Sequence, residues 1–393
     1  MKDPTSIILV GAGGYGATHG AMLLDNKAPE VRLTAIIDPY AKSSPIYDRF
    51  KDTIPTYNSL EDFYAAGQTA ELVFISSPRY LHYEHCVAAL KGGSHVLCEK
   101  PLVPTLDDLN QLDKKVTASG KTLSVGFQWC YSPVIQALKA RILAGEFGRP
   151  ICFKSLTSWP RTWKYYKRNN WAGRIKTDDG HIVHDSVVSN ACAHHLQNML
   201  FLLGGTMEDS ADLRDTYVET YRANDIESFD TCALKGNAGG AKLLFIASHA
   251  TNYHRAPAMY YELEKAVIMV DVHEQTGTCT VHHRDGRVED LGSVSGDCMA
   301  AKFAYTVQAM RGERSVVCSI NTVRPFTAVI DAIFGQVPIH AFPASHVVAD
   351  TKEACTFVPY LHVQLADCFN RGQLPSEMGL PWAKSSTLLK RFV

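Results

Sequence analysis

The chain has 393 residues, 46% of them hydrophobic, which is enough to bury more than one core and predicts two domains, residues 1–127 and 128–393. Its formal charge of -1 provides no broad field for nucleic acid or an anionic membrane, so we expect a small-molecule partner. No segment approaches the ~20 apolar residues of a membrane span, and no signal peptide is recognisable, so we expect a cytoplasmic protein.

Short apolar runs alternate with helical periodicity through residue 127. This pattern predicts parallel strands joined by crossover helices, in an α/β doubly wound sheet of the Rossmann type. The strands are expected at residues 7–10, 33–37, 72–76, 95–98 and 122–126, and the helices at residues 15–24, 60–65, 81–90 and 106–119.

The remainder of the chain, residues 128–393, is richer in β-forming runs separated by turn residues. We therefore expect an α+β domain built on a mostly antiparallel sheet, with substrate bound in the cleft between the two domains. Strands are expected at residues 151–158, 231–235, 242–248, 260–272 and 278–283, and helices at residues 190–203, 299–312, 322–334 and 351–370.

A glycine-rich segment follows the first predicted strand and leads into the first predicted helix. It reads Gly11-Ala12-Gly13-Gly14-Tyr15-Gly16 and contains the three glycines of the dinucleotide-binding pattern G-x-G-x-x-G. Gly11 would make the tight turn, Gly13 would admit the pyrophosphate, and Gly16 would let helix and strand pack closely. A glycine-rich turn without a ligand is the alternative.

The second predicted strand ends at Asp38, at about the distance along the chain expected for an acid that binds the ribose of a dinucleotide. Its carboxylate would accept hydrogen bonds from the ribose and repel a 2′-phosphate, so NAD is favoured over NADP. Lys42, Ser43 and Ser44 lie nearby and weaken this preference.

Three further segments extend the pattern: Ser76-Ser77-Pro78-Arg79-Tyr80-Leu81-His82, Glu99-Lys100-Pro101, and Asn190 to Gly204 with His194 within it. In this order they resemble the Gfo/Idh/MocA family of oxidoreductases, named after glucose-fructose oxidoreductase, inositol dehydrogenase and rhizopine catabolism. The resemblance extends over most of the chain. It implies hydride transfer between nicotinamide and a hydroxyl-bearing carbon of a sugar or polyol, and a homodimer or homotetramer.

The resemblance also implies residue roles. Lys100 matches the active-site lysine, His194 matches the histidine of an Asp-x-x-x-His segment, and Asn190 falls where the aspartate would be. Arg79, Cys130 and Gln197 also depart from the usual residues. Cofactor contacts are expected from Gly11, Gly13, Gly14, Tyr15, Gly16, Asp38, Ser77, Pro78, His82, Glu99, Lys100 and Gln128.

Oxidation of a secondary alcohol requires a base for the hydroxyl proton. Lys100 leaves the carboxyl end of a strand, where open α/β sheets bind ligands, and burial would lower its pKa toward neutrality. Asn190 and His194 are four residues apart, so on one helix they would share a face; a buried structural histidine is the alternative for His194. His195 is expected to be structural.

An aromatic and basic run at residues 159–171 is compatible with sugar binding, with Trp159, Arg161 and Tyr166 as candidate substrate residues beside Lys100, Asn190 and His194. A packed crossing or an oligomer contact is the alternative. A metal site formed by His181, His184, Asp185, His194 and His195 is a further alternative, but their spacing does not favour it and the resemblance implies catalysis without metal.

We therefore expect an NAD-dependent sugar, glycoside or cyclitol dehydrogenase. Two alternatives remain open. One is glycoside cleavage through transient oxidation with NAD, and the other is a dinucleotide-binding regulator without turnover.

Overall fold

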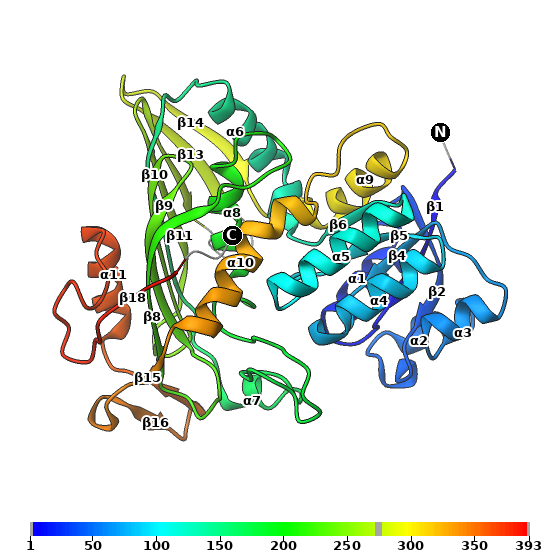
Figure 1. Cartoon of the computed structure of the whole chain (residues 1–393), viewed down its shortest axis with the longest axis horizontal. Helices are drawn as coiled ribbons and strands as arrows, with labels where there is room; N and C mark the ends of the chain where they lie inside the picture. The colour runs from blue at the N-terminus through cyan, green and yellow to red at the C-terminus, as the bar shows by residue number, and fades with distance from the viewer. Residues whose placement is uncertain (1–2, 272–276, 391–393) are drawn as a thin grey trace. The chain divides into compact units, whose positions relative to one another are not determined.

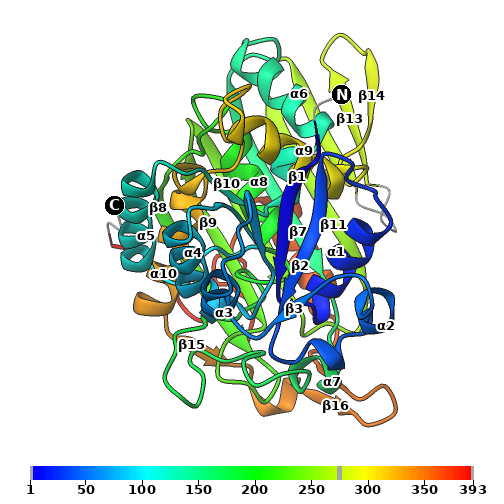
Figure 2. The same ribbon diagram turned by 90° about the vertical axis from the view of Figure 1, so that its right-hand side faces the viewer.

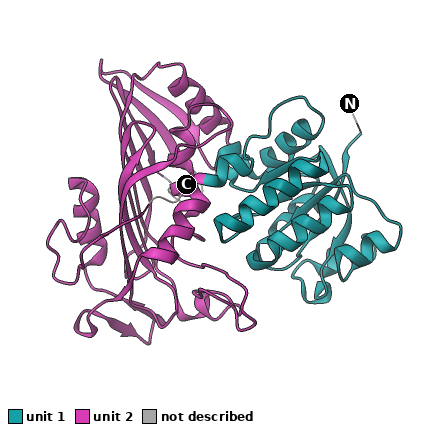
Figure 3. Cartoon of the chain, viewed as in Figure 1, with its two compact units in different colours: residues 1–131, 297–324 teal, residues 132–296, 325–393 magenta. Residues whose placement is uncertain are grey.

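The computed structural model describes residues 3–271 and 277–390. The chain forms two compact units (Figure 3). The first unit consists of residues up to 131 together with residues 297–324, and the second consists of residues 132–296 and those from 325 onward.

The first unit contains a six-stranded parallel sheet with the order β3-β2-β1-β4-β5-β6, part of which faces the viewer in Figure 2. Its inner strands are continuous apolar runs because both faces of such a sheet are buried; Leu72–Ile75, for example, is buried throughout. The predicted Rossmann sheet is confirmed. The strands are β1 (Thr5–Val10), β2 (Val31–Ile37), β3 (Thr56–Tyr57), β4 (Leu72–Ile75), β5 (His95–Cys98) and β6 (Leu123–Val125).

Of the connecting helices of the first unit, α1, α3, α4 and α5 begin and end close to the predicted residues, whereas α2 was not predicted. Two of them, α3 and α5, coincide with the prediction and begin after Ser59 and Thr105, whose side chains accept the hydrogen bond of an N-cap. The helices are α1 (Gly14–Leu24), α2 (Tyr47–Phe50), α3 (Leu60–Ala65), α4 (His82–Lys91) and α5 (Leu106–Ser119).

A later part of the chain, residues 297–324, also belongs to the first unit. Its helix α9 (Cys298–Met310) places Phe303 and Val307 in the core that α1, β1 and β2 share. Beyond this helix, the carbonyl of Cys318 accepts a hydrogen bond of 2.8 Å from the N–H of Val125 in β6. The sequence predicted the helix but assigned it to the second domain.

The second unit is built on a ten-stranded sheet within the described residues (Figure 1). Its main path is β14-β13-β12-β11-β7-β10-β9-β8-β15, and β18 pairs with β8. Within the described part of this sheet, only the pairs β7–β10 and β8–β15 are parallel, so the predicted mostly antiparallel sheet is confirmed.

The strands of this sheet are β7 (Pro150–Ser158), β8 (Leu213–Arg222), β9 (Thr231–Ala238), β10 (Ala241–Ser248), β11 (Arg255–Leu263), β12 (Ala266–Asp271), β13 (Thr278–His283), β14 (Val288–Ser293), β15 (Ile339–Ala341) and β18 (Thr387–Leu388). A separate two-stranded sheet pairs β16 (Val348–Asp350) with β17 (Cys355–Phe357).

Two sequence predictions for this unit need correction, and several of its strands were not predicted. The single strand expected at 260–272 is two antiparallel strands, β11 and β12, which turn at Glu264 and Lys265; Val272 lies outside the described residues. The helix expected at 351–370 begins only at Leu361, because β17 and Pro359 precede it. Strands β8, β14, β15, β16, β17 and β18 were not predicted.

Helices cover both faces of the large sheet (Figure 1). On β7, Thr157 bonds His195 of α8, whereas the adjacent Leu156 packs with Leu361 and Leu365 of α11; neighbouring strand residues point to opposite faces. The helices of this unit are α6 (Pro133–Leu143), α7 (Trp163–Tyr166), α8 (Ala193–Leu202), α10 (Ile320–Gln336, which starts in the first unit) and α11 (Leu361–Arg371).

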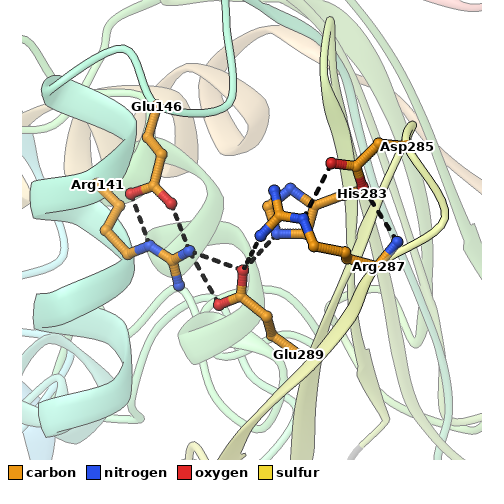
Figure 4. A network of polar contacts seen from close by, with 6 residues as sticks. All are labelled: Arg141, Glu146, His283, Asp285, Arg287 and Glu289. Carbon is orange, nitrogen blue, oxygen red and sulfur yellow. Dashed lines mark hydrogen bonds and ion pairs between the residues drawn. The ribbon is translucent and has the colours of Figure 1, made fainter.

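A network of ion pairs joins α6 to the β13–β14 hairpin (Figure 4). Arg141 contacts Glu146 at 2.5 Å and Glu289 at 3.0 Å, and Glu289 also pairs with His283. The pairs are partly solvated, so the network fixes the position of α6 more than it adds stability. Among the described helices, none has the length and apolar character required to cross a membrane.

Candidate functional site

The glycine segment of the first unit forms the turn between β1 and α1. Gly11 has φ +88°, and a Cβ on it would lie 2.8 Å from the backbone of Ser77, so a larger residue does not fit. A Cβ on Gly16 would lie 2.1 Å from the carbonyl oxygen of Gly11, which requires glycine where helix and loop touch. Both steric roles match those expected from the sequence.

The start of α1 is oriented for an anion. Gly13 is the extended N-cap and the helix begins at Gly14, so the first-turn N–H groups of Gly14, Tyr15 and Gly16 lie at the carboxyl end of β1. A Cβ on Gly13 would meet no atom within 4 Å among the described residues. The space beside Gly13 is therefore open for a ligand to approach the backbone.

Asp38 follows β2 and faces this loop. One carboxylate oxygen accepts the N–H of Ala12 at 2.8 Å and the other accepts the N–H of Tyr40 at 2.8 Å. Ser44 donates to the carbonyl of Ala12 at 2.7 Å, so its hydroxyl is already used within the loop. Asp38 is thus held at the glycine turn, as a ribose-binding carboxylate must be.

Two other predicted cofactor residues meet across the loop. The hydroxyl of Tyr15 donates to the side-chain carbonyl of Gln128 at 2.8 Å and also contacts the sulfur of Met299 at 3.7 Å. Tyr15 remains 44% exposed. Gln128 therefore sets the orientation of the tyrosine ring beside the start of α1.

The side chain of His82 connects the segment after β4 to the segment after β5 through two backbone carbonyls. The two ring nitrogens of this buried histidine lie 2.9 Å from the carbonyl of Pro101 and 3.0 Å from that of Ser77. Burial lowers the pKa of His82 to about 4, so the ring is neutral near pH 7 and donates to one of the two carbonyls. Pro78 begins the short turn that leads into α4. Direct cofactor contact by Ser77, Pro78 and His82 stays a prediction.

Glu99 belongs to a buried charged cluster that the sequence did not predict. Its carboxylate lies 2.5 Å from Nζ of Lys302, whose side chain is fully buried, and 3.6 Å from Nε2 of His19. Lys302 also contacts His19 at 2.7 Å. Burial is the largest single effect and would raise the pKa of Glu99, but its neighbours, Lys302 first among them, together outweigh burial and lower the pKa. Burial and Lys302 lower the pKa of His19 to about 3, so that ring is neutral.

Lys100 comes directly after Glu99 at the carboxyl end of β5. Its side chain is half-buried, its N–H donates to Glu99 at 3.2 Å, and the peptide bond to Pro101 is cis. The lysine backbone is therefore held by the buried cluster on one side and, through Pro101, by His82 on the other.

The sequence predicted that Asn190 and His194 lie on one helix of the second unit. The structure contradicts this prediction. Asn190 lies in the turn at residues 186–192, and α8 begins only at Ala193, so His194 alone is in its first turn. The amide of Asn190 donates to the carboxylate of Asp185 at 2.9 Å and lies 3.4 Å from the hydroxyl of Tyr165. A buried acid thus stands beside Asn190.

The neighbouring histidines differ in their surroundings. His194 is half-buried, whereas His195 is buried and its Nδ1 lies 2.9 Å from Thr157. This agrees with the structural role expected for His195. His184 stacks on Phe334, with the ring planes 3° apart. No three metal-binding side chains are grouped within the described ranges.

Within the aromatic and basic run, arginine side chains pack on aromatic rings of the same segment. The Arg161 guanidinium lies 5.0 Å from the Trp159 ring and 4.6 Å from the Tyr165 ring, and Arg168 lies 3.7 Å from the Tyr165 ring. The hydroxyl of Tyr166 is buried. The predicted site residues thus form two groups, a glycine-loop group in the first unit and the group of Trp159, Arg161, Tyr166, Asn190 and His194 in the second.

Comparisons with known proteins match the N-terminal part of the chain to a family of oxidoreductases. Residues 5–127 match the family model GFO_IDH_MocA, described as an oxidoreductase family with an NAD-binding Rossmann fold. The chain is 24% identical over 202 residues to 2,7-anhydro-N-acetylneuraminate hydratase of Mediterraneibacter gnavus, which covers 51% of this chain and 50% of that protein. It is 28% identical over 161 residues to scyllo-inositol 2-dehydrogenase (NAD(+)) of Bacillus subtilis, over 40% of this chain and 45% of that protein. These matches span about half the length of the curated relatives.

Solved structures extend the likeness of fold to most of the chain. The WlbA dehydrogenase of Bordetella pertussis, in complex with NADH and UDP-GlcNAcA, aligns with a TM-score of 0.68 and 20% identity over 84% of this chain and 96% of its own. An Agrobacterium radiobacter oxidoreductase in complex with NAD+, L-tartaric acid and magnesium gives a TM-score of 0.69 and 16% identity over 84% and 95% of the chains. Residues 5–127, which contain the glycine loop, therefore match the NAD-binding Rossmann domain of the Gfo/Idh/MocA oxidoreductase family, and the solved structures show the same fold over most of the chain.

Proposed function

We propose that this protein is an NAD-dependent dehydrogenase that oxidises a hydroxyl-bearing carbon of a sugar or cyclitol. The observation that supports it most is the conjunction, in one unit, of the glycine turn, Asp38 held at that turn, and Lys100 at the carboxyl end of β5. Ligands of open α/β sheets bind at these strand ends.

The residues of the first unit fit a dinucleotide. Gly13 leaves room for the pyrophosphate, the N–H groups of the first turn of α1 would bind its oxygens, and Asp38 would accept ribose hydroxyls. Because that carboxylate would repel an added phosphate, NAD is preferred to NADP. Bound NAD would supply the hydride acceptor.

Lys100 is the residue we assign to the reacting hydroxyl. In its neutral form Nζ takes the hydroxyl proton, and in its charged form it stabilises negative charge on that oxygen. His194 would serve as the second proton-transferring group, and Asn190 would orient the substrate. Trp159, Arg161 and Tyr166 would bind the sugar through ring faces and polar groups.

The relative from Mediterraneibacter gnavus favours a second candidate, because it is named a hydratase, a reaction without net oxidation. On this reading the chain would use NAD transiently and regenerate it within one turnover. A screen of inositols, glucose, glucose 6-phosphate, uronates and glycosides distinguishes the two. Bulk NADH formation supports the dehydrogenase, whereas product formation without NADH release supports the recycling enzyme. A homodimer or homotetramer stays a prediction, to be tested by light scattering of the purified protein.

A further inference from the structure

A small cavity lies within the second unit, and Tyr166 is the one residue of its lining that the sequence singled out for substrate binding. Tyr165, Tyr166, Asp185, Phe229 and His249 are among its walls, and its size is close to that of one water molecule. His249 follows β10 and is 2% exposed. The cavity thus has aromatic walls with polar groups between them.

The protonation of His249 follows from its contacts. Its Nδ1 lies 2.7 Å from the carbonyl oxygen of Trp159, which can only accept, so Nδ1 carries the hydrogen. Burial, followed by the charge of Arg161, lowers the pKa of His249 to about 3, so the ring is neutral. The Nε2 atom is therefore a lone-pair acceptor.

This acceptor has no hydrogen-bond partner in the described part of the chain, and the same holds for the buried hydroxyl of Tyr166. A buried polar atom without a partner costs free energy, so such an atom next to a cavity requires a hydrogen-bond donor, which a water molecule or a ligand hydroxyl can supply. Asp185 adds a carboxylate that already accepts the N–H of Gly173 at 2.6 Å and the amide of Asn190 at 2.9 Å.

We propose that this cavity receives one hydroxyl group of a neutral polyol substrate, and that His249 Nε2 accepts the hydrogen bond of that hydroxyl. The inference rests on the proposed function and makes it more specific. The acceptor atoms of His249 and Asp185 favour an O–H donor and disfavour a carboxylate or phosphate at this position.

The test compares two substitutions of His249. In His249→Asn, the amide can keep the bond to the Trp159 carbonyl but cannot place an acceptor at the position of Nε2. In His249→Gln, the longer side chain restores a polar atom there. His282→Asn, at an exposed histidine of β13, is the matched control. The probes are myo-inositol, scyllo-inositol and glucose with their monodeoxy analogues, measured by calorimetry in the presence of NAD and by NADH formation.

We expect His249→Asn to weaken binding of the preferred probe by about tenfold, with unchanged NAD affinity, and His249→Gln to recover part of the loss. One deoxy analogue should bind wild type and His249→Asn equally, because it lacks the hydroxyl in question. If the affinity of His249→Asn for every accepted probe is within twofold of the wild-type affinity, the cavity holds only water. The inference is then wrong, but the proposed dehydrogenase function is unaffected. If wild type binds NAD but neither binds nor oxidises any probe, both the inference and the proposed substrate class fail.

Discussion

Replacing Lys302 with methionine tests the buried cluster that supports the Lys100 segment. The lysine side chain is fully buried and its Nζ lies 2.5 Å from Glu99, whose own side chain is only 7% exposed. Methionine is similar in length and apolar, so the main change is loss of the positive charge. Glu99 would then be a buried carboxylate without its lysine partner.

Removing one partner of a buried ion pair costs about 3 to 5 kcal/mol, because the remaining charge stays desolvated. We expect the free energy of unfolding of Lys302→Met, measured by urea denaturation at pH 7, to fall by that amount. The double variant Glu99→Gln with Lys302→Met should recover much of the loss, since no unpaired charge is left buried.

The loss of stability in Lys302→Met should depend on pH, because the pKa of Glu99 differs between wild type and the variant. In wild type the pKa of Glu99 is lowered, so its contribution is present above the unfolded pKa of about 4.3 and is lost as pH falls through the folded value. In Lys302→Met, burial is no longer offset and the pKa of Glu99 rises. The destabilisation should therefore shrink as the pH is lowered toward 4. A Lys302→Met variant within ~1 kcal/mol of wild type, or a double variant as unstable as the single one, would refute this reasoning.

Three further predictions concern the two groups of site residues. Gly13→Val should abolish NAD binding while the unfolding midpoint stays near wild type, because a Cβ on Gly13 meets no described atom within 4 Å; calorimetric titration giving wild-type affinity would contradict the loop assignment. Asp38→Ala should weaken NAD binding by about ten- to a hundredfold and reduce the preference for NAD over NADP, since hydrogen bonds to a charged group are lost; an unchanged ratio of the two affinities would remove Asp38 from ribose recognition. Asn190→Asp should shift the pH profile of turnover. In wild type the Asn190 amide lies 2.9 Å from Asp185, so the variant places two carboxylates side by side and raises the pKa of one of them. Superimposable pH profiles would show that residues 185 and 190 lie outside the reacting centre.

The Rossmann sheet could be predicted in nearly all its elements because its signals are local. Strands such as β5 are short apolar runs, helices such as α5 begin at a capping threonine, and the glycine turn has a recognisable spacing. The steric roles of Gly11 and Gly16 follow from the same spacing. Asp38 could be placed because it directly follows a strand.

The parts that sequence missed depend on contacts between distant segments. Lys302 lies 203 residues beyond Glu99, and nothing in its local sequence distinguishes it from a solvated lysine of a helix. The same holds for His249, which reaches Trp159 across 90 residues. Asn190 was misplaced because the helical periodicity of α8 was extended three residues too far, into a turn held by Ser186 and Ser189.

The most direct measurement of the central claim is NAD reduction by wild type and Lys100→Ala across the panel of sugars and cyclitols, with NAD affinity measured in parallel. We predict that wild type forms NADH with at least one neutral polyol. Lys100→Ala should lose about 100- to 10,000-fold in kcat, as expected for loss of a general base, while its Kd for NAD stays close to wild type. Turnover by Lys100→Ala within a few-fold of wild type would contradict the account, because the proton would then leave through another group.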